Sequence, residues 1–480
     1  MIQRTARFAR YLIVLLGCWM AVGPVHATDL SIDNLHVIAS RETSNTVQVV
    51  FDVSWQNAWH NRRNHDAAWV FLKLAPEGGR SHHVTLPAEG LHALVLPGSA
   101  APPPQIDRTA DGTGFFLYPA ESYRGDVSWR ISVQLDAATL GERFRPEHLA
   151  AFAIEMVYVP EGPFILGDPD PTALQFGAFY QSGSDGEPAR LVEITSEAAL
   201  EVGSAAGQLY YHEDDYVGDR QGPVPAAFPK GYEAFYVMKY ELSQGQYVDF
   251  LNTLDDGATF ERFAFGGRSY PQKRGTIHLD DGRYVAGSPH RPLNFSRWDD
   301  GLAFADWAAI RPMTELEFTK ASRGPAPPVP GAFPWGTASR DHLARIIGPE
   351  DDLIMTNGWE EDQLSDETRA VFGASYYWVM DLAGSVWERV ISIGQPDGRA
   401  FAGSHGDGEL GERGRATNSD WPHTYDGKEG HGYRGGGFYD QGQVYHEFNP
   451  YSPVAYRRFG GWSGADPHRA YGFRAVRTAE

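Results

Sequence analysis

The sequence predicts an α+β protein in two parts: an immunoglobulin-like β-sandwich over residues 28–155, then largely irregular structure with few helices over residues 156–480. Three observations support this division. Short runs of β-branched and aromatic residues, separated by turn residues, fill the region before residue 160. Gly- and Trp-rich stretches alternate with a few well-signalled helices after it. A length of 480 residues also exceeds that of one typical domain.

The N-terminus predicts an export signal over residues 1–27. An Arg-rich start precedes the short apolar run YLIVLLGCWMAVG, and Val25, His26 and Ala27 form a small-residue cleavage site. The run is too short for a membrane-spanning helix, and no other candidate occurs. We therefore expect a periplasmic or secreted protein. The alternative is a lipoprotein anchored through Cys18, the last residue of LLGC.

Sandwich strands are predicted at residues 46–55, 67–76, 113–120, 126–135 and 149–159. A dense polar stretch between the first two strands contains His60 and His65. Two histidines five residues apart could ligate a metal. A polar turn between strands is the alternative, and the pattern favours it.

Helices in the second part are predicted from their capping residues. Ser243 with Gln246, and Thr314 with Glu317, have the spacing of capping boxes ahead of apolar residues with helical periodicity. A third helix is expected to start at Ser296. These signals are structural and predict no chemistry.

Charge and cysteine content exclude several function classes. The formal net charge of −21 argues against nucleic acid or an anionic membrane surface as a partner. Cys18 is the only cysteine, so a chain cleaved after residue 27 has none. Disulfides, thiolate metal sites and cysteine nucleophiles are then excluded together.

Several motifs occur in a fixed order after residue 155: MVYVPEGPFILGD, FYVMKYELSQGQYVDFLN, RPLNFSRWDDGLAFADWA, RPMTELEFTKASRG, FPWG, DLAGSVWERV, YRGGGFYD and YGFRAVR. The ordered set resembles the formylglycine-generating enzyme, or sulfatase-modifying factor, family. The resemblance implies a C-type-lectin-like fold over residues 156–480, with much irregular backbone and a Trp-rich core.

The resemblance also implies where the family's chemistry would lie. Founding members use two cysteines shortly after a glycine motif to bind copper and oxidise a substrate cysteine. Counted from Gly435, those positions fall near Asp440 and Tyr445, which supply no thiolate. Copper(I) strongly prefers sulfur ligands. Formylglycine generation is therefore not expected.

The family's two calcium positions are altered as well. At one, Arg345 replaces an Asn, and a guanidinium has no acceptor with which to bind calcium. At the other, Ser385 replaces an Asn and Arg389 replaces a Trp, whereas Glu388 remains. Ser385, the Val386 carbonyl and Glu388 could hold calcium. The favoured alternative is that Glu388 pairs with an arginine. No cofactor other than this possible calcium is expected.

The C-terminal segment is rich in aromatic residues set among small polar ones, which resembles the chemistry of antibody contact surfaces. We predict a protein or small-molecule ligand at this face, with packing of the same aromatics as the alternative. The candidate binding residues are Tyr439, Asp440, Tyr445, Tyr451, Tyr456, Trp462 and Arg474.

Two acidic loops are weaker candidates. His405, Asp407 and Glu409 alternate with glycines in one of them, and residues 212–215 (HEDD) lie in an insertion over residues 183–222. Either could attract a cation or hold an acid and a base, but solvated surface loops are favoured.

Three function hypotheses remain. The leading one is an exported ligand- or protein-binding module, a special case of which is a receptor diversified at its C-terminal segment. The second is a cysteine-free enzyme on the same fold, such as a periplasmic maturation or oxidation factor, with Asp440 as the candidate catalytic carboxylate. The third is a structural cell-surface protein.

Overall fold

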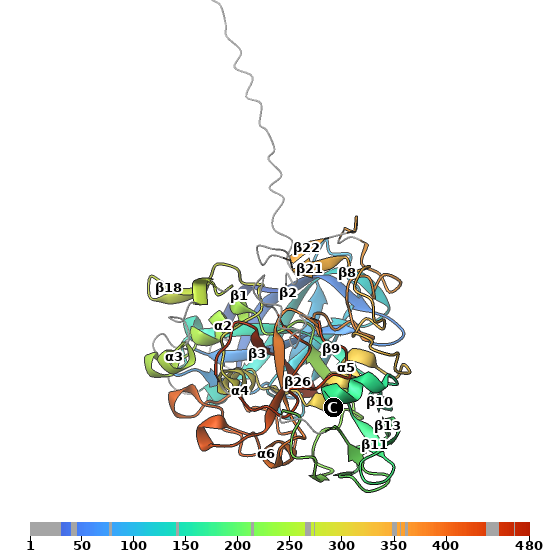
Figure 1. The fold of residues 1–480 in the computed structure, drawn as a ribbon. Coiled ribbons are helices and arrows are strands. Elements are labelled where there is room, and N and C mark those ends of the chain that lie inside the picture. Colours follow the sequence, from blue (N-terminus) through green and yellow to red (C-terminus); the bar gives the residue numbers. More distant parts are fainter. Residues whose placement is uncertain are drawn as a thin grey trace, which may run out of the picture.

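The computed structural model (Figure 1) describes residues 30–39, 46–75, 79–140, 144–212, 216–264, 270–272, 274–347, 353–355, 357–360, 363–437, 451–464 and 466–480. The predicted signal segment, with Cys18, lies outside these ranges. Within them, no helix combines the length and the apolar character that crossing a membrane requires.

Two antiparallel sheets contain the N-terminal strands, and each predicted strand is present. The first sheet has the order β1 (Ser31–Ala39), β2 (Thr46–His60), β8 (Tyr123–Asp136), β5 (Leu91–Val95). The second has the order β20 (Arg311–Pro312), β26 (Ala475–Thr478), β17 (Phe235–Met238), β9 (Leu149–Val159), β3 (Asp66–Leu74), β7 (Phe115–Pro119), β6 (Pro104–Arg108), and β4 (His82–His83) pairs with β3.

Strand β3 shows why the second sheet forms a middle layer. Alternate side chains of a strand point to opposite faces. Ala68, Val70 and Leu72 pack in one apolar cluster with β2 and β8 of the first sheet. Trp69 and Phe71, on the other face, belong to a different cluster that includes the helices of the second part. A strand covered on both faces is mostly apolar, and residues 67–72 of β3 form such a run between the buried charges of Asp66 and Lys73.

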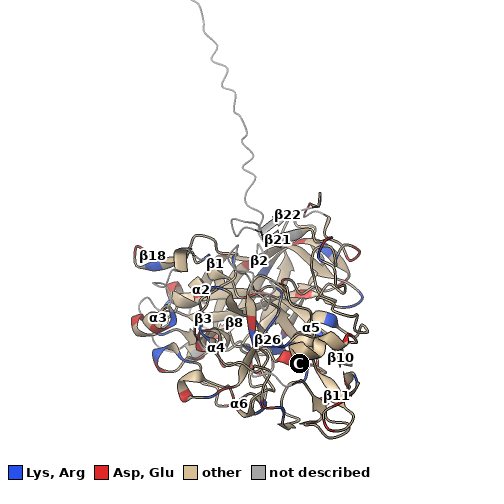
Figure 2. Cartoon of the chain, viewed as in Figure 1, with Lys and Arg blue, Asp and Glu red and all other residues tan. Residues whose placement is uncertain are grey.

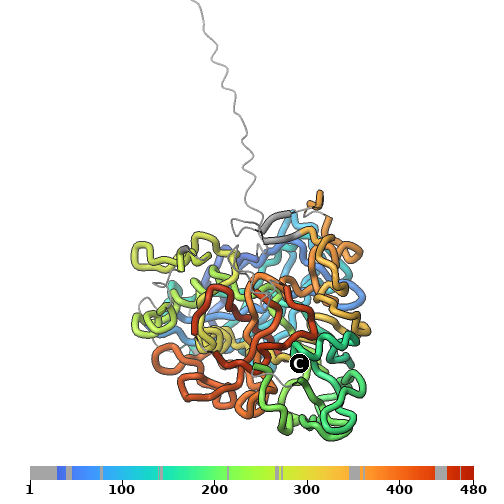
Figure 3. The backbone as a smooth tube through the Cα atoms, in the orientation of Figure 1, coloured from blue at the N-terminus to red at the C-terminus, as the bar shows by residue number. Residues whose placement is uncertain are grey.

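Strand β9 crosses the boundary predicted near residue 155 without a break. One of its edges pairs with β3 from Leu149 to Val157, and the other pairs with β17 from Met156 to Val159. The last strand, β26, then pairs with β17. Figure 3 shows this C-terminal segment, in red, passing through the middle of the view. The chain is thus an α+β protein of mostly strands with few helices. Because the second sheet also takes strands from beyond residue 155, the immunoglobulin-like description and the domain boundary stay predictions.

Four α-helices of seven or more residues lie in the described residues of the second part, and two of them begin as predicted. They are α2 (Gln244–Leu251), α3 (Asp256–Arg262), α4 (Trp298–Trp307) and α5 (Glu315–Arg323). Ser243 and Thr314 form the predicted capping boxes of α2 and α5. Helix α4 begins two residues after Ser296, because the N–H of Arg297 is the one that Asp300 accepts, at 2.7 Å.

Short strands and turns make up the rest of the second part. They are β10 (Phe164–Leu166) with β13 (Val192–Ile194); β12 (Pro188–Arg190), β11 (Tyr180–Ser182), β15 (Leu209–Tyr210), β14 (Leu200–Val202) and β16 (Gly222–Val224); β18 (Ile277–Asp280) with β19 (Arg283–Ala286); β21 (Arg345–Ile347) with β22 (Leu353–Met355); and β24 (His431–Arg434), β23 (Trp387–Ile391) and β25 (Tyr471–Phe473). The helical turns of this part are η2 (Pro171–Phe176), η3 (Tyr270–Gln272), α6 (Pro396–Arg399), η5 (Glu412–Gly414) and η6 (Thr424–Asp426). Two further helical turns, α1 (Ala137–Leu140) and η1 (Pro146–His148), lie between β8 and β9.

A buried ionic triad holds the shared sheet together. Lys239, which follows β17, contacts Glu155 of β9 and lies 3.3 Å from Asp66 of β3. Asp66 also accepts the N–H of Trp59 at 2.8 Å. All three charged groups are buried, so each depends on the others for its charge compensation.

We predict that Lys239→Met lowers the free energy of unfolding by about 3–5 kcal/mol at neutral pH, since it leaves two buried carboxylates without a cation. The deficit should shrink from pH 8 to pH 5. The pKa values of the abandoned carboxyls rise in the folded state, so stability is lost as pH increases through them. Denaturant unfolding at both pH values measures this. Adding Asp66→Asn and Glu155→Gln should recover most of the loss. A loss of stability that is the same at pH 5 and pH 8 would contradict the prediction.

Candidate functional site

The second position at which the resemblance implies calcium holds a buried ion pair. Arg474, between β25 and β26, donates to both oxygens of Glu388 on β23, at 2.9 and 2.8 Å. Its remaining donors reach the carbonyls of Met238 and Met380, at 2.7 and 2.8 Å. Both side chains are fully buried. The predicted pairing of Glu388 with an arginine is confirmed. Arg474, proposed as a ligand contact, is instead enclosed in the core with its donors in use.

A second carboxyl lies beside this pair. Glu241 accepts the N–H of Val386 at 3.0 Å, and its other oxygen has no hydrogen-bond partner among the described residues. Burial, and then the charges of Glu388 and Asp381, raise the pKa of Glu241 well above its ordinary value. Ser385 adjoins this group in a left-handed conformation with φ of 60°.

Arg389 points away from Glu388, because neighbouring residues of a strand face opposite sides. Its guanidinium donates to the Ser296 carbonyl at 2.7 Å and to the Tyr433 hydroxyl at 3.1 Å. The rings of Tyr433 and Tyr471 lie on it, at 5.4 and 5.3 Å from their centroids. Arg389 therefore serves the core. Arg345, at the other calcium position, begins β21.

The described aromatic candidates are half-buried and belong to three separate clusters. Tyr451 packs edge-on against Trp335, and Tyr456 stacks on Phe176 with centroids 4.2 Å apart. Trp462 packs against a third group that includes Tyr433. Each ring therefore buries part of its surface and exposes the rest. Tyr439, Asp440 and Tyr445 lie outside the described residues.

Tyr216 is a further exposed aromatic residue, next to the cluster that contains Trp462, and the sequence pattern did not single it out. It comes from the acidic insertion, is 42% exposed, and lies 6.0 Å from Trp462 and 5.5 Å from Phe459, centroid to centroid. In the sequence Tyr216 directly follows the acidic residues 213–215, and those charges made a solvated loop the favoured interpretation of the whole stretch. His212 is exposed, and residues 213–215 lie outside the described ranges.

The loop over residues 403–414 is docked onto the N-terminal strands. Lys73 of β3 is fully buried and donates to the Gly408 carbonyl at 2.5 Å; burial lowers the pKa of Lys73 to about 7. Glu409 accepts the backbone N–H of His83 at 2.5 Å. His405 accepts the N–H of Thr478 at 3.0 Å, and burial lowers its pKa well below the usual value. Asp407 accepts the N–H of Glu409 at 2.8 Å. These contacts give the loop a structural role.

The histidines of the first hairpin also have structural partners. His60 and His65 pair across the turn that joins β2 to β3, as the favoured interpretation predicted. His60 donates to the Pro119 carbonyl at 2.7 Å, and His65 lies 3.2 Å from the Tyr236 hydroxyl. Within the described ranges, no three His, Cys, Asp or Glu side chains meet as a metal-binding group. Acidic and basic residues are interspersed along the chain (Figure 2).

Comparisons with known proteins show which family the chain resembles. A family model, "Sulfatase-modifying factor enzyme 1-like domain", matches residues 150–479. The chain is similar to proteins named "Formylglycine-generating enzyme". Identity to the one from Bos taurus is 26% over 215 residues, covering 38% of this chain and 55% of the relative. Identity to the one from Mus musculus is 24% over 242 residues, covering 38% and 64%. For Thermomonospora curvata it is 27% over 110 residues, covering 22% and 35%. The chain thus spans about a third to two thirds of the length of these relatives.

We predict that the position around Glu388 does not bind calcium, because Arg474 holds both carboxylate oxygens. Millimolar calcium or a chelator should then produce no shift in melting temperature that depends on Glu388. Thermal melts of the wild-type protein and of Glu388→Gln test this. A calcium-dependent rise of several degrees, absent from Glu388→Gln, would contradict it.

Proposed function

Because the chain belongs to the family of sulfatase-modifying factor enzyme 1-like domains, we propose that it uses this scaffold as a ligand- or protein-binding module and not as a thiol oxidase. The cysteine content carries the proposal. Cys18, within the predicted signal segment, is the only cysteine of the chain. The family's copper chemistry depends on thiolates, and the corresponding positions near Asp440 and Tyr445 offer none.

The aromatic residues around 451–464 supply the proposed contact surface. Tyr216 and Trp462 come from segments far apart in sequence and contact each other while remaining partly exposed. Half-buried aromatic rings combine a large apolar area with little rotamer freedom, so they lose little entropy when a partner covers them. Held by the core beneath, these rings are arranged before any ligand arrives.

We place this binding activity outside the cytoplasm. The predicted signal over residues 1–27 supports a periplasmic or secreted protein, with lipoprotein anchoring through Cys18 as the alternative. Cleavage after residue 27 would leave no cysteine, which suits an oxidising compartment because no thiol could then mispair or oxidise.

The alternative is a cysteine-free enzyme on the same fold. Its candidate carboxylate, Asp440, lies outside the described residues. The carboxyls described at the family core are buried, and Glu388 is held by Arg474. These contacts support a scaffold role for that core and leave the binding-module proposal as the better supported of the two.

We predict that Tyr216→Ser weakens binding of peptides selected on the wild-type protein from a displayed library by at least tenfold, as expected for an aromatic anchor. Phe260→Ser is the matched control, because Phe260 is an exposed aromatic on α3, 77% exposed. Titration of selected peptides against the three proteins measures the difference. Equal affinity for both variants would contradict the proposed surface. Peptides recovered with altered mass would favour the enzyme.

A further inference from the structure

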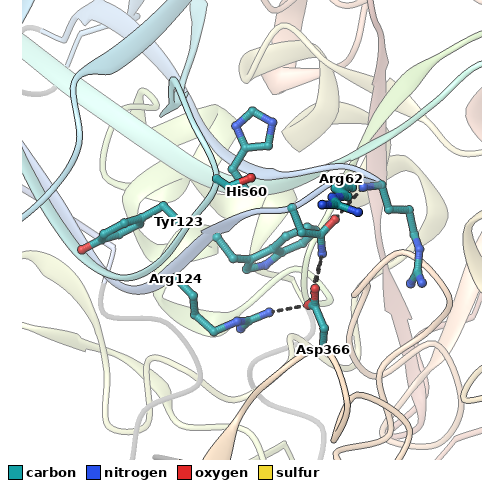
Figure 4. Close-up of a pocket in the computed structure, with 9 residues that line it drawn as sticks. His60, Arg62, Tyr123, Arg124 and Asp366 are labelled. Atoms are coloured by element: carbon teal, nitrogen blue, oxygen red, sulfur yellow. Dashed lines mark hydrogen bonds and ion pairs between the residues drawn. The ribbon is translucent and has the colours of Figure 1, made fainter.

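A pocket of about 560 Å³ lies where the N-terminal strands meet the family domain (Figure 4). Residues 59–63, at the end of β2 and in the turn that follows, form one wall. Residues 122–124, at the start of β8, form another. Asp366 completes the pocket from the family domain. The pocket is separate from the aromatic surface and has the size of a site for a small molecule.

Positive charge gathers at this pocket although the chain as a whole is strongly acidic. Arg62, Arg63 and Arg124 line it, and Asp366 is the one carboxylate among the lining residues. Asp366 is already engaged: it forms an ion pair with Arg124 at 3.1 Å and accepts from the Asn61 amide and from the Trp378 indole. The net charge of the lining groups is therefore positive, which favours an anion.

Two of the guanidinium groups are held in place by rings. Arg124 lies 4.6 Å from the centroid of Trp378 while it pairs with Asp366. Arg63 lies 4.2 Å from the centroid of Tyr376 and donates one N–H to the Tyr376 carbonyl at 2.7 Å. A stacked guanidinium is oriented in advance, so its remaining donors lose little freedom on binding an anion.

Arg62 differs from Arg63 and Arg124 in having no partner for its guanidinium among the described residues. It is exposed, and it makes no hydrogen bond or ion pair with any residue that the structure describes. An arginine presents its N–H donors as a fork that matches the two oxygens of a carboxylate, sulfate or phosphate group.

We propose that this pocket binds a small molecule carrying an oxyanionic group, with Arg62 as its principal contact and Arg63 and Arg124 as the oriented charges around it. The N-terminal strands then contribute a binding site of their own, at the contact between the two parts of the chain. This site does not depend on the proposed function of the aromatic surface.

Calorimetric titration of the full mature chain with inorganic sulfate, inorganic phosphate and citrate tests the proposal, at an ionic strength fixed with chloride. The three anions separate the possible sources of the oxyanion. We expect one-to-one binding of at least one of them, weakened at least tenfold by Arg62→Gln. Arg145→Gln is the matched control, since Arg145 is exposed and bonds only to the neighbouring Phe144 carbonyl among described residues. It should bind as the wild type does.

Three results would overturn the proposal: no binding of any of the three anions, equal affinities of Arg62→Gln and the wild type, or equal weakening by both substitutions, which would indicate general charge screening. Melting temperatures measured without anion check that both variants fold, as expected for substitutions of exposed side chains.

Discussion

The backbone pairing of β9 is the constraint on which the rest of the structure depends. One edge of this strand bonds to β3 and the other to β17, so a single sheet connects the N-terminal strands to the family domain. The first sheet covers one face of this shared sheet, and the helices of the second part cover the other. Separating the two parts would therefore expose an apolar face of the shared sheet and an unpaired strand edge.

Buried arginines supply hydrogen-bond donors to backbone carbonyls that the irregular loops leave without sheet partners. Irregular backbone has few sheet partners, and a buried carbonyl without a donor is costly. Arg457 donates to the carbonyl of Val217 while it pairs with Glu315, at 3.1 and 2.9 Å. Arg474 combines backbone carbonyls with Glu388 in the same way. A guanidinium has five donors, so it can serve a carboxylate and several loops together.

Local patterns predicted the elements well, and long-range pairing remained beyond them. The capping boxes at Ser243 and Thr314 follow from residues three positions apart, and the strand runs follow from side-chain type. The sharing of β9 depends on pairing between residues 75 to 91 positions apart, such as Leu74 with Leu149 and Asp66 with Val157, which periodicity does not encode.

The candidate site shows the same division. The absence of any cysteine after Cys18 could be read directly from the sequence. The pairing of an arginine with Glu388 was predicted in kind, but the partner is Arg474, 86 residues away, and not an adjacent residue. Tyr216 was not predicted as a contact residue, because its neighbours in space, Phe459 and Trp462, come from the distant C-terminal segment. The pocket at Arg62 could not be predicted from the sequence, because one of its lining residues, Asp366, lies about 300 positions further along the chain.

The central claim is that this chain keeps the scaffold of its family without the thiol-oxidising chemistry. The most direct measurement follows the mass of a cysteine-containing peptide incubated with copper(I), oxygen and protein lacking residues 1–27. We predict no conversion of the peptide cysteine to an aldehyde beyond a protein-free control. Catalytic conversion would contradict the claim, because it would require an oxidase site without any cysteine of the protein's own.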